Sequence, residues 1–164
     1  MDRSKVPAVL SIAGSDSSGG AGIQADIKTI TAHRLYAETA ITAITAQNTL
    51  GVTAVQNISP DIVAAQIDAV FDDIRPSAVK IGMVSSAEII EVIADRLGAW
   101  DAQNIVVDPV MVATSGARLI AEDAAEALTR RLFPLATVIT PNIPEAMALL
   151  DYCLLYTSDA ADEA

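Results

Sequence analysis

The sequence is poor in several residue types that mark large classes of proteins. It has one cysteine, Cys153, so no internal disulfide can form and a reducing compartment is expected. Only 10 basic residues stand against 21 acidic ones, and the net charge of −11 argues against a nucleic-acid partner, which would need a basic face. No apolar run is long enough to span a membrane, and residues 1–5 form no apolar signal region. We therefore expect a cytoplasmic protein without a nucleic-acid or membrane partner.

What the sequence does contain is typical of one globular α/β domain. Of its 164 residues, 52% are hydrophobic and 19% are charged, which suits a chain with a substantial core. Short apolar runs, typical of buried strands, alternate with segments of helical periodicity. This alternation predicts a mostly parallel sheet with helices on both faces. The expected strands are residues 8–13, 41–47, 52–58, 78–83, 104–108 and 137–140.

Helix boundaries and buried faces can be predicted between these strands. Ser59 and Pro60 favour a helix start, and Arg75 with Pro76 ends that helix. A second helix is expected after a capping box formed by Ser85 and Glu88. The apolar positions expected to face the core are Val63, Ile67, Val70, Phe71 and Ile74 in the first of these helices, Ile89, Ile93 and Leu97 in the second, and Leu128 and Leu132 in a third over residues 122–132.

A glycine-rich loop, residues 14–22, joins the first strand to the first helix. Glycine allows close approach to the backbone, and a helix N-terminus presents free N–H groups, so this junction favours an anionic or strongly accepting ligand. The alternative is a turn that only packs the strand against the helix. A P-loop is excluded because no lysine follows Gly22 before Lys28. A dinucleotide fingerprint, G-x-G-x-x-A from Gly20, fits weakly because no acidic residue ends the expected second strand; binding of NAD remains an alternative.

Further polar residues follow the expected strands. Ligands of parallel sheets bind beyond the carboxyl ends of the strands, where the sequence places the glycine-rich loop, residues 47–48, residues 82–83, Asp108, Asn142 and Glu145. Two carboxylates and an amide near an anion site suggest Mg²⁺ with phosphates, because hard cations prefer oxygen ligands. The alternative is that these positions simply carry turn residues.

Residues 9–150 closely resemble the hydroxymethylpyrimidine/phosphomethylpyrimidine kinases of thiamine biosynthesis, which belong to the ribokinase-like superfamily. The segments that carry the likeness are residues 11–28, 46–49, 80–83, 108–111 and 140–145. The resemblance implies a three-layer sandwich and phosphorylation of a pyrimidine's hydroxymethyl group, then of the resulting monophosphate. It also implies ATP and Mg²⁺ as cofactors, a small-molecule pyrimidine as substrate and a homodimeric intact protein.

The resemblance also assigns roles to individual residues. The pyrimidine site would contain Gly14, Asp26, Gln47, Met83 and Val110, and the Mg²⁺–ATP site would contain Asp108, Asn142 and Glu145, with Glu145 as the metal ligand. Gln47 can both donate and accept hydrogen bonds, which suits the edge of an aminopyrimidine. The local alternatives are a strand-end cap for Gln47, a core filler for Met83 and a turn residue for Asp108. Lys80 is expected to form a structural ion pair, and His33 is expected on the surface.

The sequence also departs from the family pattern. The Gly-Thr-Gly-Cys loop expected to stabilise the transferred phosphoryl group is absent, so no catalytic residue is assigned in this chain. Residues 1–150 are interpreted as the N-terminal part of the kinase domain, and residues 151–164 as a non-native tail. An unpaired sheet edge, uncovered apolar helix faces and no kinase turnover are then expected. The alternatives are a non-catalytic pyrimidine-binding fragment and a pyridoxal-type kinase.

Overall fold

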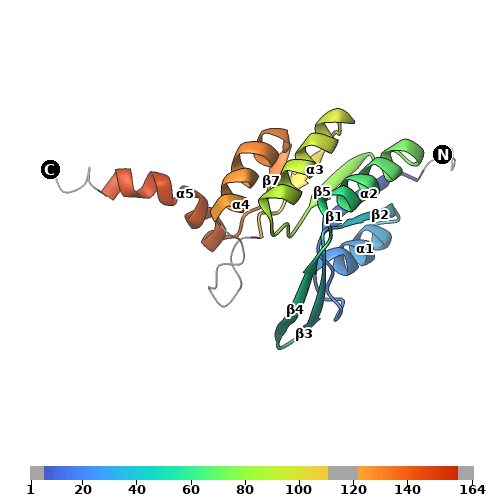
Figure 1. Cartoon of the computed structure of the whole chain (residues 1–164), viewed down its shortest axis with the longest axis horizontal. Coiled ribbons are helices and arrows are strands. Elements are labelled where there is room, and N and C mark those ends of the chain that lie inside the picture. Colours follow the sequence, from blue (N-terminus) through green and yellow to red (C-terminus); the bar gives the residue numbers. More distant parts are fainter. Residues whose placement is uncertain (1–5, 111–121, 159–164) are drawn as a thin grey trace.

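The computed structural model describes residues 6–110 and 122–158, with residues 122 and 151–158 as backbone only. A central sheet of five parallel strands has the order β2-β1-β5-β6-β7 (Figure 1). Its members are β1 (Ala8–Ala13), β2 (Tyr36–Ile41), β5 (Ala78–Ile81), β6 (Ile105–Val107) and β7 (Val138–Ile139). The expected α/β fold with a mostly parallel sheet is confirmed.

Helices lie on both faces of this sheet. On one face, α1 (Gly22–Ala32) packs against β1 and β2; on the other lie α2 (Pro60–Asp73) and α3 (Ala87–Ala99) (Figure 1). Next to α3 lies α4 (Glu122–Ala127), continued by a π-helical turn (Leu128–Leu132) and a 3₁₀ turn (Phe133–Leu135), and α5 (Ile143–Ser158) follows β7. No helix in the described residues is both long and apolar enough to cross a membrane.

The main core lies between the sheet and the helices α2, α3 and α4. Alternate strand residues such as Leu10 and Ile12 point into it, because successive side chains of a strand face opposite sides. The predicted inward positions Val63, Ile67, Phe71, Ile89, Ile93, Leu97, Leu128 and Leu132 are all buried, and Val70 is half-buried against the same core. The prediction was wrong for Ile74, which is 43% exposed because the helix ends at Asp73 and the chain turns away there.

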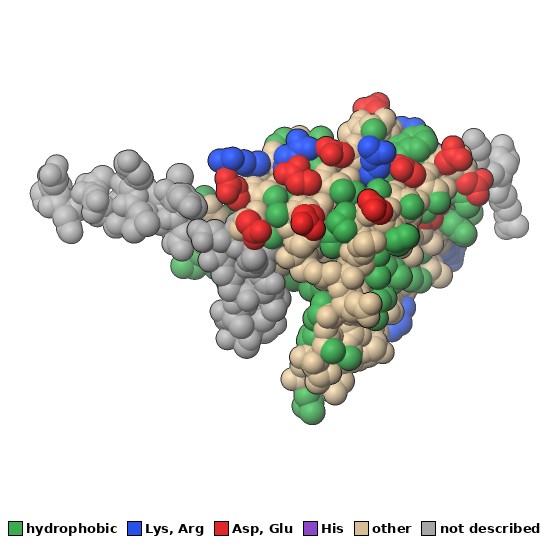
Figure 2. Space-filling model, in the orientation of Figure 1, with side chains coloured by type: hydrophobic (Ala, Val, Ile, Leu, Met, Phe, Trp, Pro, Cys, Tyr) green, Lys and Arg blue, Asp and Glu red, His purple; other side chains and the backbone are tan. Residues whose placement is uncertain are grey.

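The segment after β2 differs from the expectation of one strand over residues 41–47. β2 ends at Ile41, and a separate antiparallel hairpin follows, formed by β3 (Ala43–Asn48) and β4 (Gly51–Asn57). The switch occurs at Thr42, whose N–H still donates to the Ala13 carbonyl of the sheet while its own carbonyl already accepts from Ile58. The hairpin extends beyond the carboxyl ends of the sheet strands and carries no charged residue (Figures 1 and 2).

Two further sequence predictions can be compared with the structure. The cap of α3 is Ser86, whose hydroxyl accepts from the Ile89 N–H, and not Ser85, which instead donates to Asn57 of the hairpin. Within the described residues β7 is an edge strand, with Val138 49% and Ile139 38% exposed. This arrangement agrees with the expectation of an unpaired sheet edge.

Candidate functional site

The carboxyl ends of the parallel strands lie side by side at one end of the molecule. Gly82 N–H donates to the Ile12 carbonyl, and Asp108 N–H donates to the Ile81 carbonyl. These bonds join the chain just after each strand to the end of the neighbouring strand, so the strands end at the same edge of the sheet. The Thr140 N–H continues the series by donating to Val107. This ladder brings the segments after β1, β5, β6 and β7 together, as the sequence predicted.

The glycine-rich loop between β1 and α1 is closed by the carboxylate of Asp16. One oxygen accepts from the Ser18 N–H at 2.8 Å and the Ser18 hydroxyl at 2.7 Å; the other accepts from Gly20 at 2.9 Å and Ala21 at 2.8 Å. These bonds, the one from the Ser18 hydroxyl first, hold the pKa of Asp16 below its ordinary value. The expected anion site is therefore wrong for these amides, because an internal carboxylate already occupies them.

Gly14 and Met83 lie directly against each other. A Cβ atom at Gly14 would come within 2.7 Å of the Met83 methyl group. Two bonds hold this contact in place: Thr42 Oγ1 donates to the Met83 carbonyl at 3.0 Å, and Ser15 N–H donates to the Ala43 carbonyl at 2.8 Å. The structure thus brings two of the predicted pyrimidine-site residues together.

Gln47 lies on the hairpin, which is fastened to the glycine-rich loop. Its N–H donates to Ser17 Oγ at 2.8 Å, and the same hydroxyl donates to the Gln47 carbonyl at 2.7 Å. Thr45 makes a second pair of bonds with Ser15, at 3.0 and 2.7 Å. The Gln47 side chain is half-buried, and its Oε1 accepts from Thr45 at 3.3 Å. The backbone of Gln47 is therefore fixed beside the loop that contains Gly14.

Asp26, expected in the pyrimidine pocket, is engaged in an ion pair. Its Oδ2 lies 3.0 Å from Lys80 Nζ and accepts from Ser11 Oγ at 2.6 Å. The expected structural pairing of Lys80 is confirmed. Gly82 lies close to the same ammonium group, since a Cβ there would be 2.8 Å from Lys80 Nζ. The pair occupies the α1 face of the sheet at the ends of β1 and β5.

Asp108 is half-buried next to this pair. Burial raises the pKa of Asp108, Lys80 lowers it, and the charges of Glu145 and Asp26 raise it further. Asp108 is thus within electrostatic range of all three groups, which form one charged cluster at the ends of β5, β6 and β7. Val110 is half-buried just beyond, with its N–H donating to the Asp108 carbonyl.

Asn142 and Glu145 form a reciprocal cap at the start of α5. The Asn142 N–H donates to Glu145 Oε2 at 2.9 Å, and the Glu145 N–H donates to Asn142 Oδ1 at 2.9 Å. Glu145 is buried. Within residues 6–110 and 122–150, no three His, Cys, Asp or Glu side chains form a group that could hold a metal ion. The role of Glu145 as a metal ligand stays a prediction.

Some residues of this end were missed by sequence reasoning. Thr45, Ser15 and Ser17 fasten the hairpin, and Asp16 fixes the loop. An Asp followed two residues later by Ser is a common turn signature, so the role of Asp16 was readable from the sequence. The bonds between Thr45 and Ser15 join segments far apart along the chain, and no local pattern indicates them. His33 is exposed, as expected.

Comparison with known proteins agrees with this arrangement. The family model for phosphomethylpyrimidine kinase matches residues 16–164. The chain belongs to the phosphomethylpyrimidine kinase family. The hydroxymethylpyrimidine/phosphomethylpyrimidine kinase of Rhizobium meliloti is 57% identical over 155 residues, which cover 94% of this chain and 56% of that protein. The chain therefore spans little more than half the length of this relative.

Solved structures show the same relationship. The crystal structure of phosphomethylpyrimidine kinase from Clostridium difficile 630 superimposes with a TM-score of 0.84 at 56% identity, covering 87% of this chain and 62% of that one. The pyridoxal kinase from Staphylococcus aureus, in complex with AMP-PCP and pyridoxal, has a TM-score of 0.77 at 38% identity, covering 90% of this chain and 52% of that one. The fold is thus shared by kinases named for two different heteroaromatic alcohols.

Proposed function

We propose that the protein containing this chain phosphorylates 4-amino-5-hydroxymethyl-2-methylpyrimidine and then its monophosphate, in the cytoplasm, as a step of thiamine biosynthesis. In the first transfer the substrate hydroxyl oxygen would attack the γ-phosphorus of ATP, so that a new O–P bond forms, the bond to ADP breaks and the hydroxyl proton passes to water; in the second, a phosphate oxygen of the monophosphate would attack in the same way. The observation that carries the proposal is the contact between Gly14 and Met83 at the strand ends, beside the fixed hairpin residue Gln47.

The two parts of the site have different chemistry. Gly14, Met83 and Gln47 offer an apolar wall next to an amide, which suits a flat ring with a hydrogen-bonding edge. Asp26 would act on the ring indirectly, since its carboxylate is held by Lys80 and Ser11. Val110 follows Asp108 and would complete the wall on the side of β6.

The charged cluster would bind the nucleotide and metal. Oxygen donors from Asp108, Asn142 and Glu145 fit Mg²⁺, and the reciprocal cap holds Glu145 in one orientation before any ligand binds. Bound Mg²⁺ would neutralise phosphate charge during transfer. Burial and the neighbouring carboxylates raise the pKa of Asp108, and Lys80 opposes this rise by favouring the ionised form that a cation needs. We further propose that the intact protein is a homodimer.

Calorimetry on this chain tests the binding half of the proposal. We expect saturable heat with hydroxymethylpyrimidine and a loss of about tenfold or more in affinity for Gln47→Ala. Gln56→Ala is the matched control, because Gln56 is an exposed glutamine on the same hairpin, paired with Ile44 on the other face. Absence of binding by a folded chain, or equal losses in both variants, would overturn the assignment.

A pyridoxal-type specificity is the second candidate, favoured by the structural likeness to the pyridoxal kinase. Both ligands are flat rings with a hydroxymethyl group, so the apolar wall alone does not separate them. The same titration with pyridoxal decides between them. Tighter binding of pyridoxal than of hydroxymethylpyrimidine would favour this second function.

A further inference from the structure

A buried carboxylate without a hydrogen-bond partner lies far from the strand ends. Glu38, in the middle of β2, is 7% exposed, and its Oε2 accepts no hydrogen bond within the described part of the chain. Its side chain lines a depression of about 240 Å³ together with Ala69, Val70 and Asp73 of α2. A buried carboxylate is costly unless it takes up a proton or a donor or cation compensates it, so a ligand of positive charge would stabilise its ionised form.

A second carboxylate faces the same depression. Burial first, and the nearby charge of Asp73 second, raise the pKa of Glu38 to about 7. Neither side chain takes part in an ion pair among the described residues. Arg75, which lines the adjoining depression next to Asp73, donates to the carbonyls of Trp100 and Asp101 instead. Within the described part of the chain, the two acidic groups that line this depression thus have no ion-pair partner.

An apolar surface continues from this acidic pair. A neighbouring depression of about 530 Å³ shares Tyr36, Asp73 and Ile74 with the first and is also lined by Val6 and Pro7. Tyr36 is 52% exposed, Ile74 43% and Val6 58%, so three large apolar side chains lie open along one edge of the sheet. Contiguous exposed apolar surface of this kind marks binding sites. The two depressions together are called the β2 groove.

We propose that the β2 groove binds a small organic cation, with a primary ammonium group between Glu38 and Asp73 and an apolar body over Tyr36 and Ile74. An ammonium group offers three donors, enough to serve both carboxylates. A metal ion fits less well, because the described residues include no group of three potential metal ligands. The groove lies at the start of β2 and the end of α2, opposite to the strand ends that carry the candidate kinase site.

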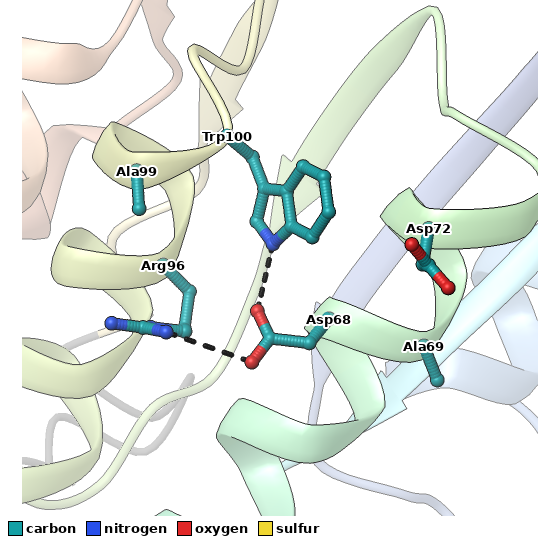
Figure 3. A pocket seen from close by; sticks show the side chains of 6 residues that line it. All are labelled: Asp68, Ala69, Asp72, Arg96, Ala99 and Trp100. Atoms are coloured by element: carbon teal, nitrogen blue, oxygen red, sulfur yellow. Dashed lines mark hydrogen bonds and ion pairs between the residues drawn. The ribbon is translucent and has the colours of Figure 1, made fainter.

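Asp68, in the groove between α2 and α3, is an acidic residue that, unlike Glu38, has both a hydrogen-bond donor and a cation beside it. There Asp68 accepts from Trp100 Nε1 at 2.7 Å and lies 3.6 Å from the Arg96 guanidinium (Figure 3). Asp72 also lines that groove, although it is adjacent to Asp73 in sequence (Figure 3). Asp72→Asn therefore removes the same charge from the same helix without touching the β2 groove, and it serves as the matched control.

Titration of the chain with hexylammonium at pH 8, followed by ¹H–¹⁵N NMR, tests the proposal. We expect saturable shifts at residues of β2 and the end of α2, and binding of hexanol that is weaker by about tenfold or more. Glu38→Gln and Asp73→Asn should each weaken hexylammonium binding by about tenfold or more, and Asp72→Asn should not. Tyr36→Ala should weaken hexylammonium more than methylammonium.

Three results would overturn the inference. Equal binding of hexanol and hexylammonium would show that charge is not recognised. Equal losses in Asp72→Asn and Asp73→Asn would indicate only a general attraction to an acidic surface. The third result is that the chain binds no amine and forms a concentration-dependent dimer in sedimentation experiments, and that Tyr36→Ala abolishes this dimer. A second copy of the chain would then cover the groove.

Discussion

Replacement of Glu38 by glutamine should make the stability of the chain less dependent on pH. The carboxyl group is buried and lacks a hydrogen-bond partner among the described residues, and burial together with Asp73 raises the pKa of Glu38 from 4.5 to about 7. Below pH 4.5 the group is protonated in both the folded and the unfolded chain, and it contributes no pH dependence. Between pH 4.5 and 7 the unfolded chain loses the proton while the folded chain keeps it. The free energy of unfolding must therefore fall as pH rises.

The size of the effect follows from the two pKa values. The difference between 4.5 and about 7 corresponds to about 3 kcal/mol, reached above pH 7 and constant beyond it. Glu38→Gln keeps the shape of the side chain but cannot ionise. The free energy of unfolding of Glu38→Gln minus that of the parent chain should therefore increase by about 3 kcal/mol between pH 4 and pH 8.

Urea denaturation at a series of pH values measures this difference. Glu88→Gln is a suitable control, because Glu88 is exposed on α3 and its replacement should leave the pH profile almost unchanged. Parallel profiles for the parent chain and Glu38→Gln would refute the reasoning. In the parent chain, hexylammonium at saturating concentration should restore part of the lost stability at pH 8, because it binds only the folded state.

Three further substitutions test the rest of the structure. Gly14→Ala would press on the flexible end of Met83, 2.7 Å away, so pyrimidine affinity measured by calorimetry should fall while the urea midpoint changes little; a large loss of stability would contradict this. Lys80→Met removes the cation that lowers the pKa of Asp108, so that pKa, followed by ¹³C NMR of the carboxyl group, should rise; an unchanged value would contradict the proposed coupling. Ile67→Ala removes a fully buried side chain and should cost about 2–5 kcal/mol in urea denaturation, and a cost below about 1 kcal/mol would mean that α2 does not pack as described.

The elements of the fold were largely predictable because their signals are local. The stripe of Val63, Ile67 and Phe71 follows helical spacing, and the helix starts where Ser59 and Pro60 indicate. The break between β2 and β3 was not predictable, because residues 36–47 form one continuous strand-like run. Only the bonds of Thr42 to two different partners create that break.

The candidate site was predictable to a smaller extent. Parallel strands deliver their carboxyl ends to one edge whatever their side chains are, so the grouping of Asp108 with Glu145 followed from the topology. The bonds of Asp16 within the loop and the pairing of Asp26 with Lys80 depend on side-chain positions that spacing alone does not fix. The burial of Glu38 was not predicted, because the expected strand began only at residue 41, whereas β2 begins at Tyr36 and includes Glu38.

The most direct test of the central claim is a map of where the pyrimidine binds. ¹H–¹⁵N NMR of the chain titrated with hydroxymethylpyrimidine should show saturable shifts at residues 14–17, 43–47 and 82–83, the segments that the hairpin and loop bonds hold together. Shifts confined to other regions, or no shifts from a folded chain, would contradict the assignment of the strand ends as the substrate site.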